Sequence, residues 1–119
     1  MTYPLAFSTW GKEEVEAIQR VIDTDMYTMG KHVKQFEKEF AEMFGSPHAI
    51  MVNSGSSANL LMLSLLKWKY KLSGDIVVPV VGWATTFFPV SQNGFKLNFV
   101  DVDPNTWNID VKKIEAAIT

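Results

Sequence analysis

The region after His48 alternates strand-like apolar runs with helix-like amphipathic runs, and this alternation constrains the fold more than any other feature. The predicted strands and helices are, in chain order, 48–52, 57–72, 76–80, 85–92, 96–101 and a last helix capped by Asp110. Because parallel strands are joined through crossover helices, this order predicts a mostly parallel sheet flanked by helices. The expected fold class is α/β.

Two further amphipathic helices are predicted before this region, over residues 12–23 and from about residue 32 to Phe44. The helix over 57–72 is expected to bury four apolar side chains, which are Leu61, Met62, Leu65 and Leu66. Pro89 is expected in the first turn of its helix, where a missing N–H costs least. No linker or repeat interrupts the pattern, so we expect residues 1–119 to form one partial domain.

A turn of small residues, Asn53-Ser54-Gly55-Ser56-Ser57, joins the first predicted strand of the alternation to its helix. We expect Gly55 to let the backbone turn sharply, and the hydroxyls of Ser56 and Ser57 to lie beside the first, unpaired amides of the helix. Such a group of donors predicts a phosphate-sized anion site. The alternative is that Ser54 or Ser56 only caps the helix.

Trp83 follows the next predicted strand, 76–80. Loops at the carboxyl ends of parallel strands open into one crevice, so Trp83 is expected to face the same opening as the serine turn. A flat aromatic ring beside an anion site suits a flat, phosphorylated cofactor. The alternative is that Trp83 packs in the core or at an interface.

Composition excludes several other classes of site. The net charge is −2 and Arg20 is the only arginine, which argues against a nucleic-acid surface. There is no cysteine, and His32 and His48 are isolated, so no metal site is expected. No apolar run approaches the length of a membrane span, and the absence of cysteine suits a reducing compartment. We expect a cytoplasmic protein.

Several short motifs occur in a fixed order along the chain. They are Gly30 with Val33, Phe36, Glu37, Phe40 and Ala41; Ser54 through Asn59; Trp83 through Thr86; Phe99 through Asp103; and Asn108-Ile109-Asp110. In this order and spacing the chain resembles the DegT/DnrJ/StrS family of pyridoxal-phosphate-dependent sugar aminotransferases along nearly its whole length. The serine motif, the connector 26–30 and the Trp-x-Thr-Thr loop are most similar to its nucleotide-sugar 3-dehydratase branch.

The resemblance implies the N-terminal portion of a fold-type I large domain with pyridoxal 5'-phosphate at the carboxyl edge of the sheet. It implies that Gly55, Ser56 and Ser57 bind the cofactor phosphate and that Trp83 stacks on the pyridine ring. Asp101, Asp103 and Glu37 also match the family. We assign these three carboxylates to turn, strand-end and helix-surface structure rather than to chemistry.

The function implied is that of the N-terminal part of a nucleotide-sugar aminotransferase or 3-dehydratase. Its implied partners are a nucleotide-linked 4-keto-6-deoxy sugar, an amino donor such as glutamate, and a second subunit. The family's catalytic lysine, replaced by histidine in dehydratases, is expected beyond Thr119, as is the carboxylate that faces the pyridine nitrogen. We therefore assign no catalytic residue and expect the chain to be inactive alone.

Two other readings compete with this one. A naturally truncated, non-catalytic homologue would act as a binding or self-association module, because an unpaired strand and an open apolar patch favour association. A dinucleotide-binding domain is disfavoured, because no Gly-x-Gly-x-x-Gly follows the first predicted strand.

Overall fold

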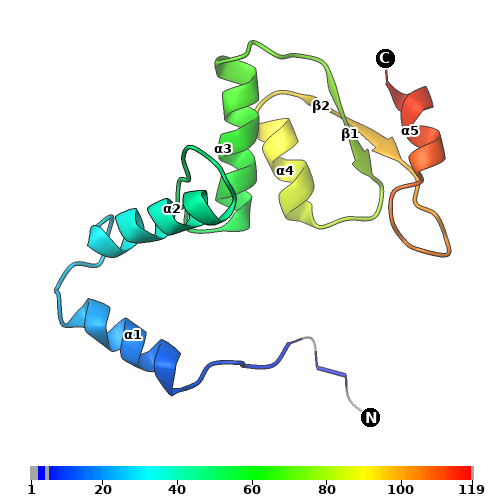
Figure 1. Cartoon of the computed structure of the whole chain (residues 1–119). Helices are drawn as coiled ribbons and strands as arrows, with labels where there is room; N and C mark the ends of the chain where they lie inside the picture. The colour runs from blue at the N-terminus through cyan, green and yellow to red at the C-terminus, as the bar shows by residue number, and fades with distance from the viewer. Residues whose placement is uncertain (1–2, 5, 119) are drawn as a thin grey trace. The chain divides into compact units, whose positions relative to one another are not determined.

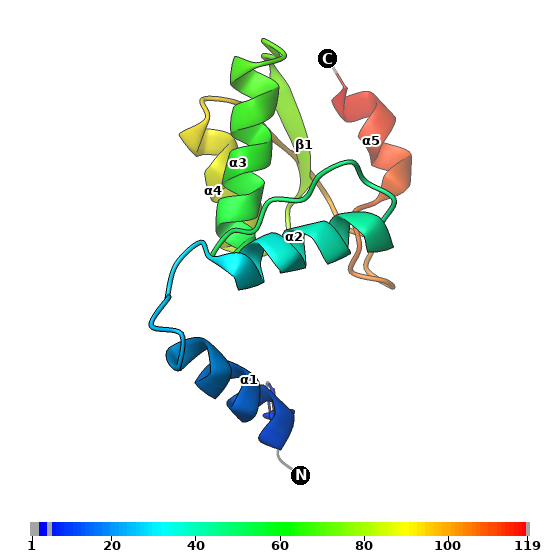
Figure 2. The ribbon, with the colours of Figure 1, turned by 60° about the vertical axis from the view of Figure 1, so that its left-hand side comes forward.

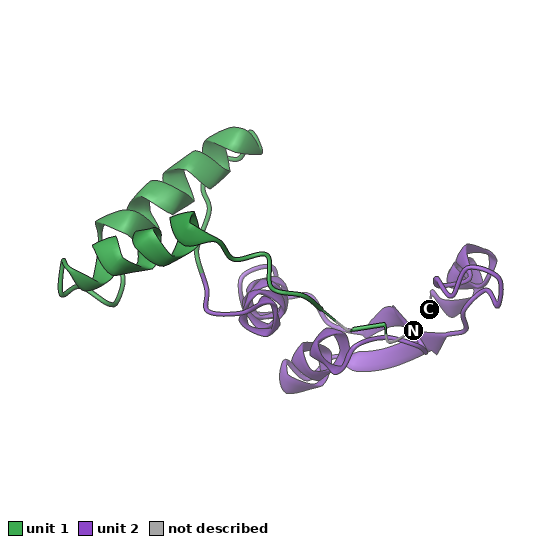
Figure 3. Cartoon of the chain, turned by 90° about the horizontal axis from the view of Figure 1, so that it is seen from below, with its two compact units in different colours: residues 1–51 green, residues 52–119 purple. Residues whose placement is uncertain are grey.

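The computed structural model describes residues 3–4 and 6–118 (Figure 1). Within these residues the chain has five helices and two strands. It divides into two compact units, Met1–Met51 and Val52–Thr119, shown in separate colours in Figure 3. The single domain expected over residues 1–119 stays a prediction.

Unit 1 contains the two predicted N-terminal helices, α1 (Lys12–Ile22) and α2 (Lys31–Met43), labelled in Figure 2. The α1 N-terminus is closed by Glu14, whose Oε2 accepts the Gly11 N–H at 2.7 Å. This contact is the main cause that lowers the pKa of Glu14. Both helices form with their apolar residues largely exposed.

The strand predicted over residues 48–52 is wrong, since these residues form no regular structure. A strand needs a neighbouring strand to pair its backbone groups. In unit 1 the Met51 N–H instead donates to Glu37 Oε1 at 2.9 Å. This bond gives Glu37 the structural role expected for it.

Unit 2 holds the rest of the α/β pattern. Its elements are α3 (Gly55–Trp68), β1 (Asp75–Pro79), α4 (Ala84–Gln92), β2 (Lys96–Val100) and α5 (Val111–Ala117). The two strands pair in parallel, with Ile76 opposite Leu97 and Val78 opposite Phe99. The segment β1–α4–β2 is therefore a parallel β–α–β crossover, which confirms the α/β class.

The core of unit 2 lies between α4 and the sheet. Its most buried side chains are Val78 of β1, Val100 of β2, Val90 of α4 and the adjacent Phe95. Gly94 allows the chain to leave α4 because it adopts φ +70°, a left-handed conformation that a side chain would disfavour. At the other end of the unit Asp110 caps α5 as predicted, with its Oδ1 accepting the Lys112 N–H at 3.1 Å.

The buried face predicted for α3 is wrong. Leu61, Met62 and Leu65 are about half exposed, at 47%, 56% and 46%, and Leu66 is 37% exposed. Met62 and Leu66 border an open hollow next to β1 and α4, whereas no element within the described parts of unit 2 packs on the side of Leu61 and Leu65. The helix α3 contacts α4 through hydrogen bonds that polar side chains make with each other and with backbone groups. Asn59 bonds to the Thr85 carbonyl, and Ser64 donates to Asn93 Oδ1 at 2.8 Å.

Pro89 also departs from the prediction. It is the sixth residue of α4, beyond the first turn, and it is buried. A proline at this position cannot donate to the carbonyl four residues earlier, which belongs to Thr85. Asn59 of α3 supplies a donor for that carbonyl.

Candidate functional site

The N-terminus of α3 begins abruptly after an extended residue. Ser54 has φ −163° and ψ 160°, and its Oγ accepts the Ser57 N–H at 3.2 Å. This is an N-cap bond, so the capping alternative is confirmed for Ser54. The Ser57 hydroxyl donates to Asn53 Oδ1 at 2.6 Å, which fixes Ser57 in the same small network.

The cap leaves other donors of the turn unused. Within the described residues, no acceptor is found for the N–H groups of Gly55 and Ser56 or for the Ser56 hydroxyl. These groups lie at the positive end of the α3 dipole. Capping and anion binding are therefore compatible here, because they use different donors of the same turn.

The role predicted for Gly55 needs correction. Its φ lies outside the left-handed region, so glycine is not required for the turn, which is made by the extended Ser54. A Cβ added at Gly55 would meet no atom within 4 Å. The missing side chain thus leaves open space beside the first amides of α3, which an anion could enter.

A hollow of about 210 Å³ lies beside these donors in unit 2. One wall comes from α3 and the other from α4, and the lining residues are Ser56, Ser57, Leu60, Thr85, Phe88, Pro89 and Gln92. None of these lining residues is acidic. In Figure 1 the first turns of α3 and α4 lie at the same end of the unit as the carboxyl end of β1. The two predicted loops do converge on one edge.

Trp83 lies at this edge but outside the lining of the hollow. It is the N-cap residue of α4, and its side chain is 76% exposed. Packing in the core, one of the alternatives for Trp83, is therefore wrong. Stacking on a ring and packing at an interface both remain predictions.

Two residues that shape the site are not among those predicted from the sequence. Thr85 lines the hollow, and its carbonyl accepts from Asn59 Nδ2 at 3.2 Å. The available signal was Pro89, because a proline inside a helix leaves a carbonyl for another donor to satisfy. Asn59 stands within the serine motif and is the nearest polar residue one turn into α3.

Asp101 and Asp103, which the sequence assigns to strand-end and turn structure, each accept a backbone N–H. Asp103 Oδ1 accepts the Asn105 N–H at 2.7 Å in a tight turn. Asp101 accepts the Val102 N–H at 2.9 Å and a Lys113 Nζ at 3.3 Å. The Val102 N–H, followed by Lys113, lowers the pKa of Asp101.

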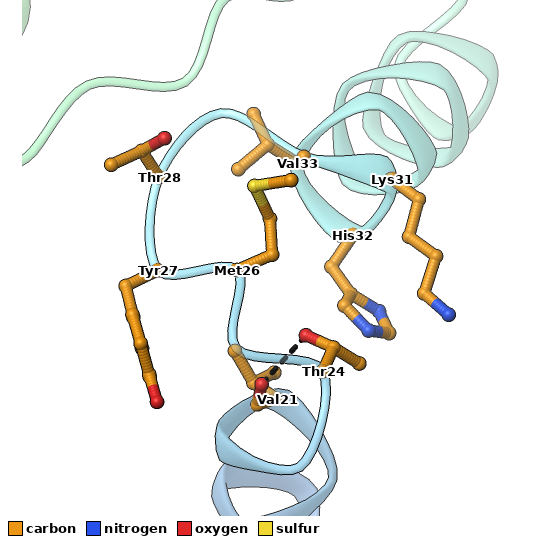
Figure 4. Close-up of a pocket in the computed structure, with 9 residues that line it drawn as sticks. Val21, Thr24, Met26, Tyr27, Thr28, Lys31, His32 and Val33 are labelled. Carbon is orange, nitrogen blue, oxygen red and sulfur yellow. Dashed lines mark hydrogen bonds between the residues drawn. The ribbon is translucent and has the colours of Figure 1, made fainter.

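A second hollow, of about 470 Å³, lies in unit 1 between α1 and α2. Figure 4 shows its lining, which includes Met26, Tyr27 and His32 and one internal hydrogen bond, from Thr24 Oγ1 to the Val21 carbonyl at 2.7 Å. None of the predicted site residues lines it.

The described residues contain no cluster of metal-ligating side chains. No helix within them has the length and apolarity needed to cross a membrane, and the cytoplasmic location stays a prediction.

Comparison with known proteins extends this description. The chain is 52% identical to a GDP-4-keto-6-deoxy-D-mannose 3-dehydratase of Yersinia pseudotuberculosis over 123 aligned residues, which cover 100% of this chain and 31% of the relative. The structure of the Escherichia coli GDP-4-keto-6-deoxy-D-mannose 3-dehydratase with bound hydrated PLP superimposes with a TM-score of 0.88. That match has 50% identity and covers 99% of this chain and 31% of the solved chain.

A more distant solved structure has the same fold. The sugar aminotransferase CalS13 of Micromonospora echinospora superimposes with a TM-score of 0.81 at 26% identity, over 98% of this chain and 31% of that one. The chain thus spans about a third of the length of the relatives it matches. The model of the DegT/DnrJ/EryC1/StrS aminotransferase family matches residues 8–119. The chain therefore belongs to the DegT/DnrJ/EryC1/StrS aminotransferase family.

Proposed function

We propose that this chain supplies the phosphate-binding edge of a pyridoxal-phosphate-dependent nucleotide-sugar enzyme. The observation that carries the proposal is the set of unused donors at the N-terminus of α3, next to a hollow without acidic lining. A phosphate dianion needs several converging N–H and O–H donors, and a helix N-terminus provides them with a favourable dipole. The bound PLP of the Escherichia coli relative supports this choice of anion.

Gly55 and Ser56 would hold the phosphate through their amides, with the Ser56 hydroxyl as a third donor. Ser57 belongs to the same set, although its hydroxyl must first leave Asn53 to donate to the phosphate. The open space beside Gly55 fits a phosphate oxygen brought close to the backbone. Trp83 would stack on the pyridine ring. When bound, the cofactor supplies the electron sink for breaking bonds at the sugar carbon.

The reaction proposed for the whole enzyme is the 3-dehydration of a GDP-linked 4-keto-6-deoxy sugar with glutamate as amino donor. It rests on relatives at 50% identity or more that carry the dehydratase name, and on a related solved structure with a trapped PLP-glutamate adduct. Amination of the sugar is the second possibility, because aminotransferases share the fold. A homo-oligomer is part of the proposal, supported by the apolar face of α3 that nothing in unit 2 covers within the described residues.

The test uses the longest gene product that contains these residues. Ser56→Ala and Trp83→Ala should each weaken PLP retention after dialysis, about tenfold or less per lost donor or stacking contact. Ser91→Ala is the matched control, since Ser91 lies near the far end of α4 and outside the lining of the hollow. Retention that is equal in all variants would contradict the site.

The same protein, incubated with GDP-4-keto-6-deoxymannose and glutamate, distinguishes the two reactions. Loss of the sugar's 3-hydroxyl with release of ammonia supports dehydration, whereas a stable amino sugar indicates a transaminase. If the protein forms neither product, the proposed reaction is contradicted, while the proposed cofactor site is unaffected.

A further inference from the structure

The hollow beside the serine turn has two walls on different helices. The α3 wall contributes Ser56 and Ser57, and the α4 wall contributes Thr85 and Pro89. A phosphate held by α3 would meet Thr85 across this space. The distance between the helices at this end therefore decides how well the donors of the hollow converge.

Pro89 creates a specific vacancy in the hydrogen bonding of α4. It has no N–H, so the Thr85 carbonyl lacks its usual α-helical donor. Asn59 Nδ2 takes that place from α3, at 3.2 Å and in a partly buried position. The bond joins residues 26 apart in the chain and links the two walls of the hollow directly.

A second group of hydrogen bonds joins the C-terminal end of α4 to the middle of α3. Ser64 Oγ donates to Asn93 Oδ1 at 2.8 Å, and Asn93 Nδ2 donates to the Pro89 carbonyl at 2.9 Å and to the Leu60 carbonyl at 3.4 Å. Without the Asn59 bond, the C-terminal end of α4 would stay bonded to α3 through Asn93, while the first turn of α4 could move away from Ser56. The Asn59 bond therefore sets the width of the hollow more directly than the bonds of Asn93 do.

We infer that Asn59 is a positioning residue for the phosphate site, acting through the Thr85 carbonyl that Pro89 leaves open. This inference rests on the proposed function, because it assumes a phosphate ligand at the α3 N-terminus. Asn59 does not touch that ligand. It holds the α4 wall at the separation at which the donors of both walls face one phosphate.

The test compares Asn59→Ala with Ser64→Ala in the longest gene product that contains these residues. PLP and inorganic phosphate are the probes, and their dissociation constants are measured by titration alongside the urea midpoint of unfolding. Both variants remove one helix-to-helix hydrogen bond and should lower the midpoint. Only Asn59→Ala should also raise the dissociation constants, by about fivefold, the weight of one ordinary hydrogen bond.

Pro89→Ala supplies an independent check. An alanine at this position restores an N–H that can donate to the Thr85 carbonyl within α4. In the Pro89→Ala background, Asn59→Ala should therefore leave the urea midpoint unchanged. It should also change the dissociation constants of PLP and phosphate by less than twofold. Such non-additivity is expected only if the two residues act on the same carbonyl.

The outcomes separate the inference from the function on which it rests. If the unaltered protein binds PLP and Asn59→Ala binds it equally well, the inference is overturned and the proposed function stands. Equal weakening by Ser64→Ala would also overturn it, since the effect would then be general loosening. If the unaltered protein binds neither probe, both the function and the inference fail.

Discussion

The loop that carries Trp83 depends on a close contact that a single methyl group would break. Gly82 lies close to the outer end of the Phe87 ring, and a Cβ at this position would stand 2.8 Å from Phe87 Cζ. Carbon atoms in van der Waals contact are about 3.5–4.0 Å apart, so Gly82→Ala forces a shift of roughly 1 Å. The Phe87 ring also packs edge-on to Phe99, with ring centroids 5.5 Å apart, and this contact limits how far the ring can move.

Two opposing effects set the change in the free energy of unfolding that is expected for Gly82→Ala. Overpacking of this kind costs about 1–3 kcal/mol. Replacing glycine by alanine returns about 0.4–1 kcal/mol, because the unfolded chain has fewer conformations. The free energy of unfolding should therefore fall by about 1 kcal/mol in Gly82→Ala.

Urea unfolding followed by tryptophan fluorescence measures this loss. Gly55→Ala is the stability control, since its Cβ meets nothing within 4 Å, and it should not lower the midpoint. In a Phe87→Leu background, which lacks the Cζ atom, Gly82→Ala should lose most of its cost. A Gly82→Ala protein as stable as the original would refute the contact, as would an equal cost in both backgrounds.

Two further predictions concern local structure. Ser54→Ala removes the N-cap of α3 and should lower the unfolding free energy by about 1 kcal/mol, whereas Ser56→Ala, which caps nothing, should leave it unchanged; equal losses in urea would contradict the assignment. The pKa of Asp101 is lowered first by the Val102 N–H and then by Lys113, so its stabilising contribution is present above the ordinary Asp range and is lost as pH falls through the lowered pKa. Lys113→Ala should raise that pKa toward its ordinary value in an NMR titration of the carboxyl carbon, and an unchanged pKa would refute the ion pair's part in the shift.

The sequence predicted the elements whose formation is decided locally. Asp110 capped its helix as expected, and the apolar runs at 76–80 and 96–101 became paired strands. The cap and the two apolar runs are patterns of neighbouring side chains, which a sequence displays directly, whereas the pairing of the strands also required the crossover through α4. The residues of the serine turn also fell at a helix N-terminus beside a hollow, as the motif predicted.

The failures at residues 48–52 and on α3 depend on partners distant in the chain, whereas those at Gly55 and Pro89 concern local backbone geometry. Residues 48–52 are apolar but find no strand to pair with among the described residues. Leu61 and Leu65 lie on a regular helical face that nothing in unit 2 covers within the described range. Asn59 became visible only when the structure brought it to the Thr85 carbonyl, across 26 residues of sequence. Periodicity identifies a face or a strand but not what covers it.

The most direct test of the central claim follows backbone amides during a titration with inorganic phosphate and then with PLP. In ¹⁵N NMR spectra of the longest gene product that contains these residues, both ligands should move the amide signals of Gly55 and Ser56 most. PLP alone should also move the indole N–H of Trp83, because only PLP carries a ring. Signals that move chiefly outside the α3 N-terminus, or that do not move at all, would contradict the phosphate site.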